Sequence, residues 1–335
     1  MAANRQLSGS PGGYELLDFG SGRKLERFGD QILDRPSPAA TAYHCDTPEL
    51  WKQATLRFEL GDGHRGDWWI AVESASSKWA TVPKERPFHG QRFRLWDQKR
   101  PPQWVCDLSF GTFQCKGTDF GHVGLFPEHF RWWEELSEQV GRSAALPNVG
   151  AAFSVLSLFA YTGGSSIAMA RAGAQVTHVE AAKNVVQWAR ENARLSGMAA
   201  APIRWLCEDV QVYVRREVKR GSTYRGLILD PPTYGHGPKG QVWKIQRDLP
   251  GLLEQLAEIS SPDLEFVLLS AHSEDFDARQ LRQLFETHFL GRRGSTSGRL
   301  SSINNQLQCE DPATNPRTSA GLDAGVRLLW LAKKN

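Results

Sequence analysis

Residues 155–166 read VLSLFAYTGGSS, an apolar run that changes abruptly at Tyr161 into Thr162, two glycines and two serines. The apolar run predicts a buried strand, and Gly163 with Gly164 predicts a tight turn into a helix. Two adjacent glycines also allow backbone N–H groups and the start of the next helix to approach a ligand closely. The two glycines alone do not show whether this segment is only a tight turn or also a ligand-binding site. Other parts of the sequence are needed to distinguish these interpretations.

From Phe153 onward, strand-like and helix-like segments alternate. In order they are FSVLSLFA, SIAMARAG, QVTHVE, AAKNVVQWARENARLSG, IRWLCED, VQVYVRREVKR, YRGLILD, a helix from about Lys244 to Ile259, and LEFVLLSA. Such alternation is typical of a parallel sheet covered by helices. Ligands of these sheets bind beyond the carboxyl ends of the strands, where the strand order reverses. Residues that follow each strand are therefore the first candidates for a binding site.

Polar residues stand at the ends of four of these strands. The first strand ends in AYTGG, the second in Glu180, the third in Asp209 and the fourth in DPPTYG, residues 230–235. Glu180 is placed to accept hydrogen bonds from ribose hydroxyls, and Asp209 is a candidate for an adenine amino group. For either carboxylate alone, a helix N-cap or a surface charge is the simpler explanation. The joint placement of four such ends favours a nucleoside-binding site.

The glycine turn also distinguishes between nucleotide cofactors. YTGGSS lacks the G-x-G-x-x-G spacing of nicotinamide-binding enzymes, so no pyrophosphate cradle is predicted. S-adenosylmethionine carries adenosine and an amino acid without a phosphate, and it needs only a glycine turn beside its methionyl part. The sequence therefore favours S-adenosylmethionine, with a dehydrogenase as a distant alternative.

The fourth strand end has its own chemistry. Pro231 and Pro232 fix the backbone and remove two N–H donors, which leaves Asp230 and nearby carbonyl groups as acceptors. An acceptor cluster suits an amino group or ring nitrogen, and Tyr234 is placed to stack on a flipped-out base. A rigid loop with Tyr234 packed on the sheet is the structural alternative.

The first half of the chain differs from the second in amino-acid composition and pattern. Eight of the 12 tryptophans lie in the first 133 residues, within short aromatic and β-branched runs separated by turn residues, which predicts many short strands. Residues 78–104 contain seven basic, two acidic and five aromatic residues. This composition fits contacts to phosphates and unpaired bases, and it equally fits a solvated β-hairpin. The segment HVGLFPEHFRWWEELSEQVGR predicts a loop entering an amphipathic helix at the junction of the two halves.

Whole-chain properties exclude several classes of protein. The 335 residues carry 40 Lys plus Arg against 37 Asp plus Glu, and a net charge of +3 does not by itself indicate a nucleic-acid partner. Five widely spaced cysteines without C-x-x-C indicate neither a disulfide framework nor a zinc site, and no metal is expected. The start of the chain lacks the pattern of a signal peptide, and no apolar stretch is long enough for a membrane span. We therefore expect a soluble cytoplasmic protein.

The motifs LFAYTGG, HVEAAKNVVQWARENARLSG and LILDPPTYG together resemble those of class I S-adenosylmethionine-dependent methyltransferases. More narrowly, they resemble the bacterial family that methylates cytosine or guanine in large-subunit ribosomal RNA. This resemblance implies a Rossmann-like domain over residues 121–335, with a mostly parallel seven-stranded sheet and helices on both faces. It implies a small β-rich accessory domain that binds RNA over residues 1–120. The implied cofactor is S-adenosyl-L-methionine, and the implied partner is RNA, specifically ribosomal RNA.

The resemblance also implies roles for individual residues. The chain departs from the family pattern at two positions: Ser157 stands where many relatives have an acidic or amide residue, and Glu180 replaces the commoner Asp. Glu180 would hold the ribose and Asp209 the adenine. Asp230 would bind the cofactor and border the methyl-transfer site. The residues implied around the methionyl part of the cofactor are Ala160, Tyr161, Thr162 and Gly163. Those implied in catalysis are Asp230, Pro231, Pro232 and Tyr234. Lys239 and Lys244 are candidates for phosphate contacts, with solvated lysines as the alternative.

The atom that receives the methyl group is predicted from a missing thiol. Relatives that methylate carbon 5 of cytosine use a cysteine thiolate, and the resemblance places it where this chain has Ser270. Cys207 ends another strand and is interpreted as a buried thiol. We therefore predict transfer to a nitrogen, on a purine. The alternatives are a carbon-5 cytosine methyltransferase, a protein or small-molecule methyltransferase of the same fold, and a noncatalytic RNA-binding module.

Overall fold

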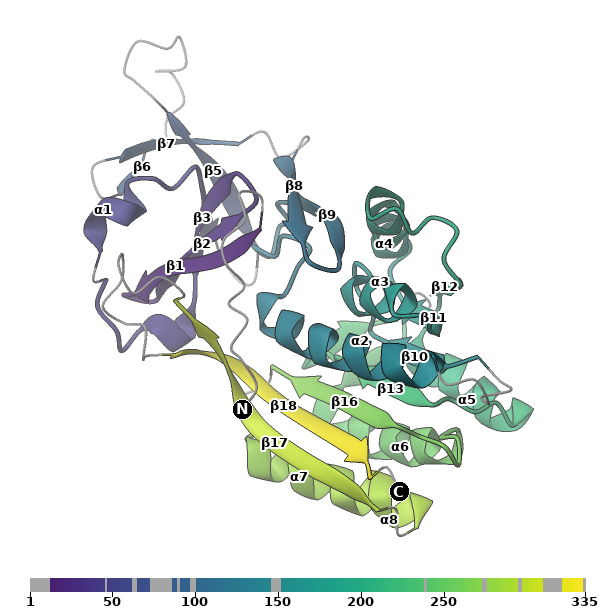
Figure 1. Ribbon diagram of the computed structural model, residues 1–335. Coiled ribbons are helices and arrows are strands. Elements are labelled where there is room, and N and C mark those ends of the chain that lie inside the picture. Colours follow the sequence, from purple (N-terminus) through teal and green to yellow (C-terminus); the bar gives the residue numbers. More distant parts are fainter. Residues whose placement is uncertain are drawn as a thin grey trace. The chain divides into compact units, whose positions relative to one another are not determined.

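A computed structural model describes residues 13–45, 47–61, 65–72, 86–88, 91–96, 101–145, 152–237, 240–272, 276–294, 297–309 and 321–333. The chain divides into two compact units (Figure 1). Unit 1 consists of Met1–Pro127 and Gln306–Asp323, and unit 2 consists of Glu128–Asn305 and Ala324–Asn335. For comparison, the domains predicted from the sequence were residues 1–120 and 121–335.

Unit 1 is rich in β-structure, as predicted. A seven-stranded sheet has the order β1-β2-β3-β4-β5-β7-β6, and β8 pairs with β9 in a separate hairpin. Two short helices, η1 (Pro38–Ala40) and α1 (Pro48–Trp51), lie between β3 and β4 in the chain. The strands are β1 (Tyr14–Gly20), β2 (Arg23–Phe28), β3 (Gln31–Pro36), β4 (Leu56–Leu60), β5 (Gly66–Val72), β6 (Arg86–Phe88), β7 (Gln91–Leu95), β8 (Gln103–Leu108) and β9 (Gly111–Lys116).

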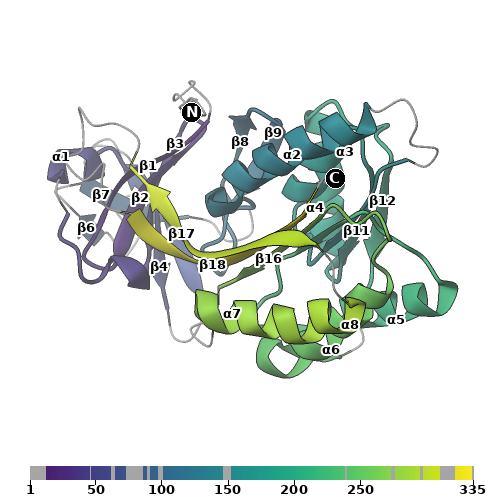
Figure 2. The ribbon, with the colours of Figure 1, turned by 60° about the horizontal axis from the view of Figure 1, so that its bottom comes forward.

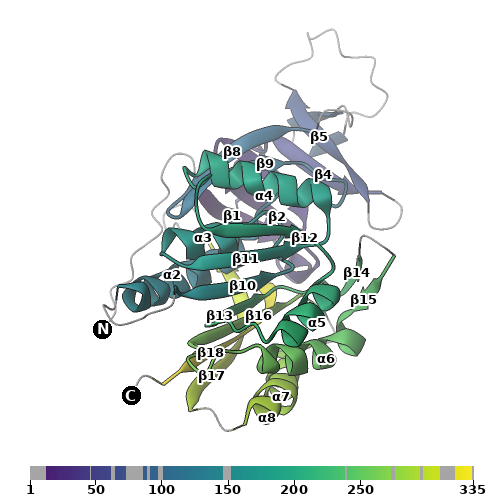
Figure 3. The ribbon, with the colours of Figure 1, turned by 90° about the vertical axis from the view of Figure 1, so that its right-hand side faces the viewer.

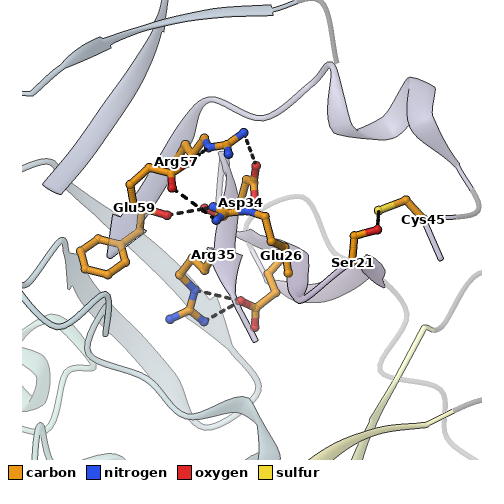
Figure 4. A network of polar contacts seen from close by, with 9 residues as sticks. Ser21, Glu26, Asp34, Arg35, Cys45, Arg57 and Glu59 are labelled. Atoms are coloured by element: carbon orange, nitrogen blue, oxygen red, sulfur yellow. Dashed lines mark hydrogen bonds and ion pairs between the residues drawn. The ribbon is translucent and has the colours of Figure 1, made fainter. Parts of the chain in front are cut away.

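Neighbouring strands of unit 1 bury several charged side chains against one another (Figure 4). The fully buried Glu26 carboxylate of β2 accepts hydrogen bonds from Arg35 of β3, with 2.9 Å between Oε2 and Nε. Burial alone would raise the pKa of Glu26, but the positive charges of Arg35 and Lys24 outweigh it and lower the pKa. Oδ2 of Asp34 lies 3.4 Å from Nη1 of Arg57. For Asp34 the effect of burial exceeds that of the neighbouring charges, so the pKa of Asp34 is raised. The network is thus held by paired charges in a low-dielectric environment.

Unit 2 contains a second seven-stranded sheet, in the order β12-β11-β10-β13-β16-β18-β17 (Figure 3). The strands from β12 to β16 pair in parallel, and β18 pairs antiparallel with β16. This confirms the predicted Rossmann-like, mostly parallel sheet. Its strands are β10 (Ser154–Leu158), β11 (Gln175–Glu180), β12 (Ile203–Cys207), β13 (Gly226–Leu229), β16 (Phe266–Ala271), β17 (Gly298–Gln308) and β18 (Gly321–Ala332).

Helices cover both faces of the unit 2 sheet. In Figures 1 and 2, α2, α3 and α4 lie on one face, and α5, α6, α7 and α8 lie on the other. A short hairpin of β14 (Tyr234–His236) and β15 (Val242–Lys244) precedes α6. The helices are η2 (Pro127–His129), α2 (Phe130–Ala144), α3 (Gly164–Arg171), α4 (Lys183–Leu195), α5 (Val210–Arg220), α6 (Ile245–Glu258), α7 (Ala278–Phe285), the π-helical turn η3 (Glu286–Leu290) and α8 (Gly291–Arg293).

The central strands of unit 2 are apolar because helices bury them on both sides. All four residues of β13 and all six of β16 are buried. The predicted junction helix is confirmed as α2, whose buried face includes Phe130, Trp133 and Leu136. None of the helices in the described part of the chain has the length and apolar character needed to cross a membrane.

Candidate active site

The strand order of unit 2 reverses at β10. This strand pairs with β11 on one side and with β13 on the other, so that Leu158 lies between Val179 and Leu229. The chain therefore leaves β10 in one direction to build β11 and β12, and it returns on the opposite side with β13. Such a switch point opens a crevice outside the carboxyl ends of the strands. The predicted site residues follow these strand ends.

The turn after β10 has an unusual backbone. Phe159, Tyr161 and Gly163 have φ values of 53°, 47° and 86°. Positive φ is uncommon for residues other than glycine, and each such residue costs about 1–3 kcal/mol unless its surroundings hold it. Tyr161 is held because its N–H donates to Oε2 of Glu180 at 3.2 Å. The turn and the end of β11 are therefore fixed as one piece.

The two glycines are required by the packing of the protein on itself. A Cβ at Gly164 would lie 2.3 Å from the indole of Trp133 in α2, and one at Gly163 would lie 3.1 Å from Ala189 in α4. Both distances are too short for ordinary contact, so neighbouring helices approach where the side chains are omitted. Ala160 and Thr162 are buried, and Asn192 donates to the Thr162 carbonyl at 2.9 Å.

Glu180 and Asp209 both bind backbone N–H groups. Besides Tyr161, the Glu180 carboxylate accepts from the N–H of Ala182 at 2.9 Å. Burial raises the pKa of Glu180, and its backbone hydrogen bonds oppose that rise. Asp209 caps α5 by accepting from the N–H of Val212 at 3.0 Å, which is the N-cap role weighed above. The contacts of Glu180 with ribose and of Asp209 with adenine stay predictions.

Asp230 follows β13 and is surrounded by three polar side chains. Its Oδ1 accepts from the Ser270 hydroxyl at 2.6 Å and lies 3.6 Å from Nε2 of His272. Its Oδ2 lies 3.3 Å from Nε2 of His129. Burial would raise the pKa of Asp230, but the charges of His129 and His272 and the hydroxyl outweigh it and hold the pKa well below its usual range. Asp230 is therefore an ionised acceptor, with a side chain that is 25% exposed.

The proline loop after Asp230 leads into the short hairpin. Pro231 is buried and Pro232 is exposed, and the Pro232 carbonyl accepts from the Trp243 indole at 2.7 Å. This carbonyl is therefore already engaged within the protein. Tyr234 is 52% exposed and its ring lies 5.0 Å from that of His236, so the alternative in which Tyr234 packs on the sheet is wrong. Its exposed ring offers a surface on which a base could stack.

Sequence reasoning missed the two histidines beside Asp230. His129 lies just before α2 and is buried with its ring stacked on Trp133, 5.8 Å between centroids. Burial lowers the pKa of His129, but the Asp230 carboxylate outweighs burial and the pKa is raised. His272 comes one residue after β16, so the rule of inspecting strand ends could have found it. No local signal in FPEH pointed to His129.

These histidines and Glu128 also have the donor atoms of a cation site. One donor atom from each of Glu128, His129 and His272 lies within 4.8 Å of the others. However, the Nε2 atoms of both imidazoles already face the oxygens of Asp230. The contacts within this group are therefore those of one carboxylate between two imidazoles.

Several other predicted residues have different outcomes. Cys207 is exposed because it ends β12 at the edge of the sheet. The prediction that Cys207 is a buried thiol is therefore wrong. The Ser157 hydroxyl is buried 2.9 Å from that of Ser165. Lys244 is exposed, and Lys239 lies outside the described residues. Much of the basic, aromatic segment also lies outside them, at residues 78–85, 89–90 and 97–100.

Comparisons with known proteins agree with this geometry. The family model for S-adenosylmethionine-dependent methyltransferases matches residues 136–275. A solved S-adenosylmethionine-dependent methyltransferase from Agrobacterium tumefaciens is 32% identical, with 97% of this chain and 92% of that chain covered and a TM-score of 0.79. The putative methyltransferase SMU.776, complexed with SAH, shares the fold at 16% identity, covering 97% of this chain and 76% of that chain, with a TM-score of 0.64.

Curated relatives match a shorter stretch. Ribosomal RNA large subunit methyltransferase K/L of Shewanella frigidimarina is 29% identical over 187 residues, which are 55% of this chain and 24% of the relative. The protein of the same name from Shewanella baltica (strain OS155) is 31% identical over 157 residues, 46% of this chain and 20% of the relative. The aligned stretch thus spans about a quarter or less of the length of these relatives.

Proposed function

The chain belongs to the S-adenosylmethionine-dependent methyltransferases, and from this premise we propose that it methylates a nitrogen atom of a base in ribosomal RNA. One observation carries the proposal: at the switch point, an ionised Asp230 and an exposed Tyr234 flank a proline-fixed loop. An ionised acceptor suits an amino group, and an exposed ring suits a base that has left its stack. The names of the curated relatives support ribosomal RNA as the substrate.

The switch-point crevice fits the cofactor of this family. S-adenosylmethionine supplies an electrophilic methyl group when it is bound. The turn from Phe159 to Gly163 follows β10, Glu180 ends the neighbouring strand β11, and Asp209 follows β12. We assign Glu180 to the ribose hydroxyls, Asp209 to the adenine and the turn to the methionyl part.

The residues after β13 would orient the acceptor. Asp230 would accept a hydrogen bond from the target nitrogen and direct its lone pair toward the methyl group. The Ser270 hydroxyl fixes one Asp230 oxygen, so the carboxylate has a defined orientation. Tyr234 would stack on the target base, and Pro231 and Pro232 would keep the loop from rearranging.

Transfer to nitrogen is favoured because unit 2 offers no suitable thiolate. Ser270 offers a hydroxyl, which is a far weaker nucleophile than a thiolate, and it donates its hydrogen bond to Asp230. Cys207 is the one cysteine in the sequence of unit 2, and it ends β12, three strand spacings from β13. Three spacings of a sheet are about 14 Å, which is too far for attack on a base held beside Asp230. RNA containing 5-fluorocytosine, which traps thiolate enzymes, should therefore form no covalent adduct.

The decisive experiment compares methylated nucleosides, by mass spectrometry, in total RNA from cells with and without the protein. Loss of one N-methylated purine from ribosomal RNA is the expected result. Loss of 5-methylcytosine instead would favour the carbon-5 alternative. Unchanged RNA methylation would overturn the proposal and leave a protein or small-molecule substrate, or a noncatalytic RNA-binding role.

We also propose that unit 1 supplies RNA affinity, because basic and aromatic residues concentrate in the first 104 residues. Phosphate contacts release counterions, so binding of the intact protein to RNA should weaken steeply as the salt concentration rises.

Glu180→Ala should weaken S-adenosylmethionine binding about 10- to 150-fold, which corresponds to about 1.5–3 kcal/mol for a charged hydrogen-bond pair. The reason is that the variant removes the carboxylate assigned to the ribose. Isothermal titration calorimetry measures the change, and a thermal unfolding curve shows whether the variant is folded. Glu191→Ala, on the exposed surface of α4 beside Arg194, is the matched control and should bind normally. Unchanged affinity in Glu180→Ala would remove this residue from the site.

A further inference from the structure

We propose that His272 is the proton acceptor of the methyl transfer, receiving the proton through Asp230, and that His129 positions Asp230. This inference rests on the proposed function, because a target nitrogen must lose a proton once it is methylated. Three neighbouring elements bring the groups together: Asp230 follows β13, His272 follows β16, and His129 ends η2. The two imidazoles lie edge to face, with 5.6 Å between ring centroids.

Asp230 can guide the proton but is a poor final acceptor. In spite of burial, His129, with Nε2 3.3 Å from Oδ2, holds the pKa of Asp230 well below the usual range, so Asp230 has a strong conjugate acid. It therefore accepts a hydrogen bond from the target nitrogen without keeping the proton. A second base must therefore lie near the carboxylate, and Nε2 of His272 is 3.6 Å from Oδ1, just longer than a hydrogen bond.

The two imidazoles beside Asp230 have different surroundings. The His129 side chain is 5% exposed and stacks on Trp133, and the Asp230 charge favours its protonated form. It is thus suited to hold the carboxylate in place. The His272 side chain is 37% exposed, so it can pass a proton on to water.

Groups on every neighbouring element bear on His272. Among the residues that the structure describes, the charged or titratable groups facing His272 include Glu128, with Oε1 3.9 Å from Nδ1 of His272, together with His129 and Asp230. On β18, Gly325 passes so close that a Cβ there would lie 2.8 Å from Nδ1. Arg327 of β18 pairs in register with Ser270, and its guanidinium lies over Trp132.

The proton and electron movements balance without another reactant. The lone pair of the target nitrogen forms the new bond to the methyl carbon, and the carbon–sulfur pair stays on sulfur, which becomes a neutral thioether. The nitrogen then carries a positive charge and loses its proton toward Oδ1 of Asp230. His272 takes up that proton on Nε2 and releases it to solvent, which returns the site to its starting state.

The test is single-turnover methylation of the target RNA between pH 5 and 8, where imidazoles titrate. The wild-type rate should rise with pH, because the acceptor must be deprotonated. His272→Gln should lower the rate about 10²–10⁴-fold and lose this rise, with S-adenosylmethionine affinity unchanged. Added imidazole should partly restore His272→Ala. His129→Gln should be slower but keep the rise, and His288→Gln, which alters an exposed histidine beside Glu254, should match the wild type.

The possible results separate this inference from the proposed function. A His272→Gln variant with the wild-type rate and pH profile would overturn the inference alone. Loss of wild-type activity on chelation, restored by Zn²⁺, would also overturn it and assign the histidines to a cation. If the wild type methylates no RNA nucleoside at all, the proposed function fails and this inference fails with it.

Discussion

Asp230→Ala is expected to slow methyl transfer about 10²–10⁴-fold while leaving S-adenosylmethionine affinity within about twofold. The variant removes a carboxylate that faces both histidines and the serine hydroxyl, and with it the acceptor proposed for the target nitrogen. Cofactor affinity should be retained, because the assigned cofactor contacts lie mainly on Glu180, Asp209 and the turn after β10. Single-turnover rates and calorimetry measure the two quantities separately.

Two further variants sharpen this experiment. Asp230→Asn keeps a carbonyl acceptor of the same size but loses the charge, so we expect it to retain more activity than Asp230→Ala. Asp263→Ala alters an exposed carboxylate before β16 and should behave as the wild type. A wild-type rate in Asp230→Ala would mean that the proline loop does not border the reacting atoms.

Asp230 should also make folding depend on pH. Its pKa is lower in the folded protein than its ordinary value, so its contribution to stability is present above the ordinary carboxyl pKa and is lost as the pH falls below it. The pKa of His129 is raised, so the contribution of His129 is present at low pH and is lost as the pH rises through the folded-state pKa. The Asp230–His129 pair therefore contributes most to stability at pH values above the ordinary carboxyl pKa and below the folded-state pKa of His129.

The sheet of unit 2 could be predicted because short segments of the sequence are enough to identify each of its strands and helices. Apolar runs bounded by turn residues gave the strands, helical periodicity gave the helices between them, and their alternation gave the parallel order. Glu180, Asp209 and Asp230 could be predicted as strand-end residues for the same reason. Their hydrogen bonds to Tyr161, Val212 and Ser270 depend on how the chain packs and could not.

Other features depend on contacts between segments that are distant in the sequence. His129 lies beside Asp230 although it is 101 positions earlier in the chain, and the residues next to His129 in the sequence do not indicate this contact. The sequence around the glycine pair predicts a tight turn or a ligand contact, and the close approach of Trp133 and Ala189 depends on packing that the sequence does not reveal. Likewise, Gln306–Asp323 belongs to unit 1 although β17 and β18 join the sheet of unit 2, and no composition change in the sequence indicates this return.

Unit 1 contains the buried charges for which we expect the largest loss of stability. Arg35→Ala should lower the free energy of unfolding by about 3–5 kcal/mol, because it leaves the Glu26 carboxylate buried without its main partner. Denaturant titration followed by far-UV circular dichroism measures the loss. It should be smaller at acidic pH, because the lowered pKa of Glu26 means that its paired charge stabilises the fold above its ordinary pKa and ceases to do so as the pH falls.

The matched control for Arg35→Ala is Arg27→Ala. Arg27 pairs with Glu15 at 3.3 Å from the neighbouring strand, but its side chain is 35% exposed. Water screens that pair, so its loss should cost about 1 kcal/mol or less. The double variant Glu26→Met/Arg35→Met should recover part of the stability lost in Arg35→Ala, since it replaces both members of the buried pair by apolar side chains. Lys24, whose side chain is 17% exposed, then loses its 3.0 Å contact with Glu26. Equal losses in Arg35→Ala and Arg27→Ala would show that burial of the Glu26–Arg35 pair does not govern the stability of this unit.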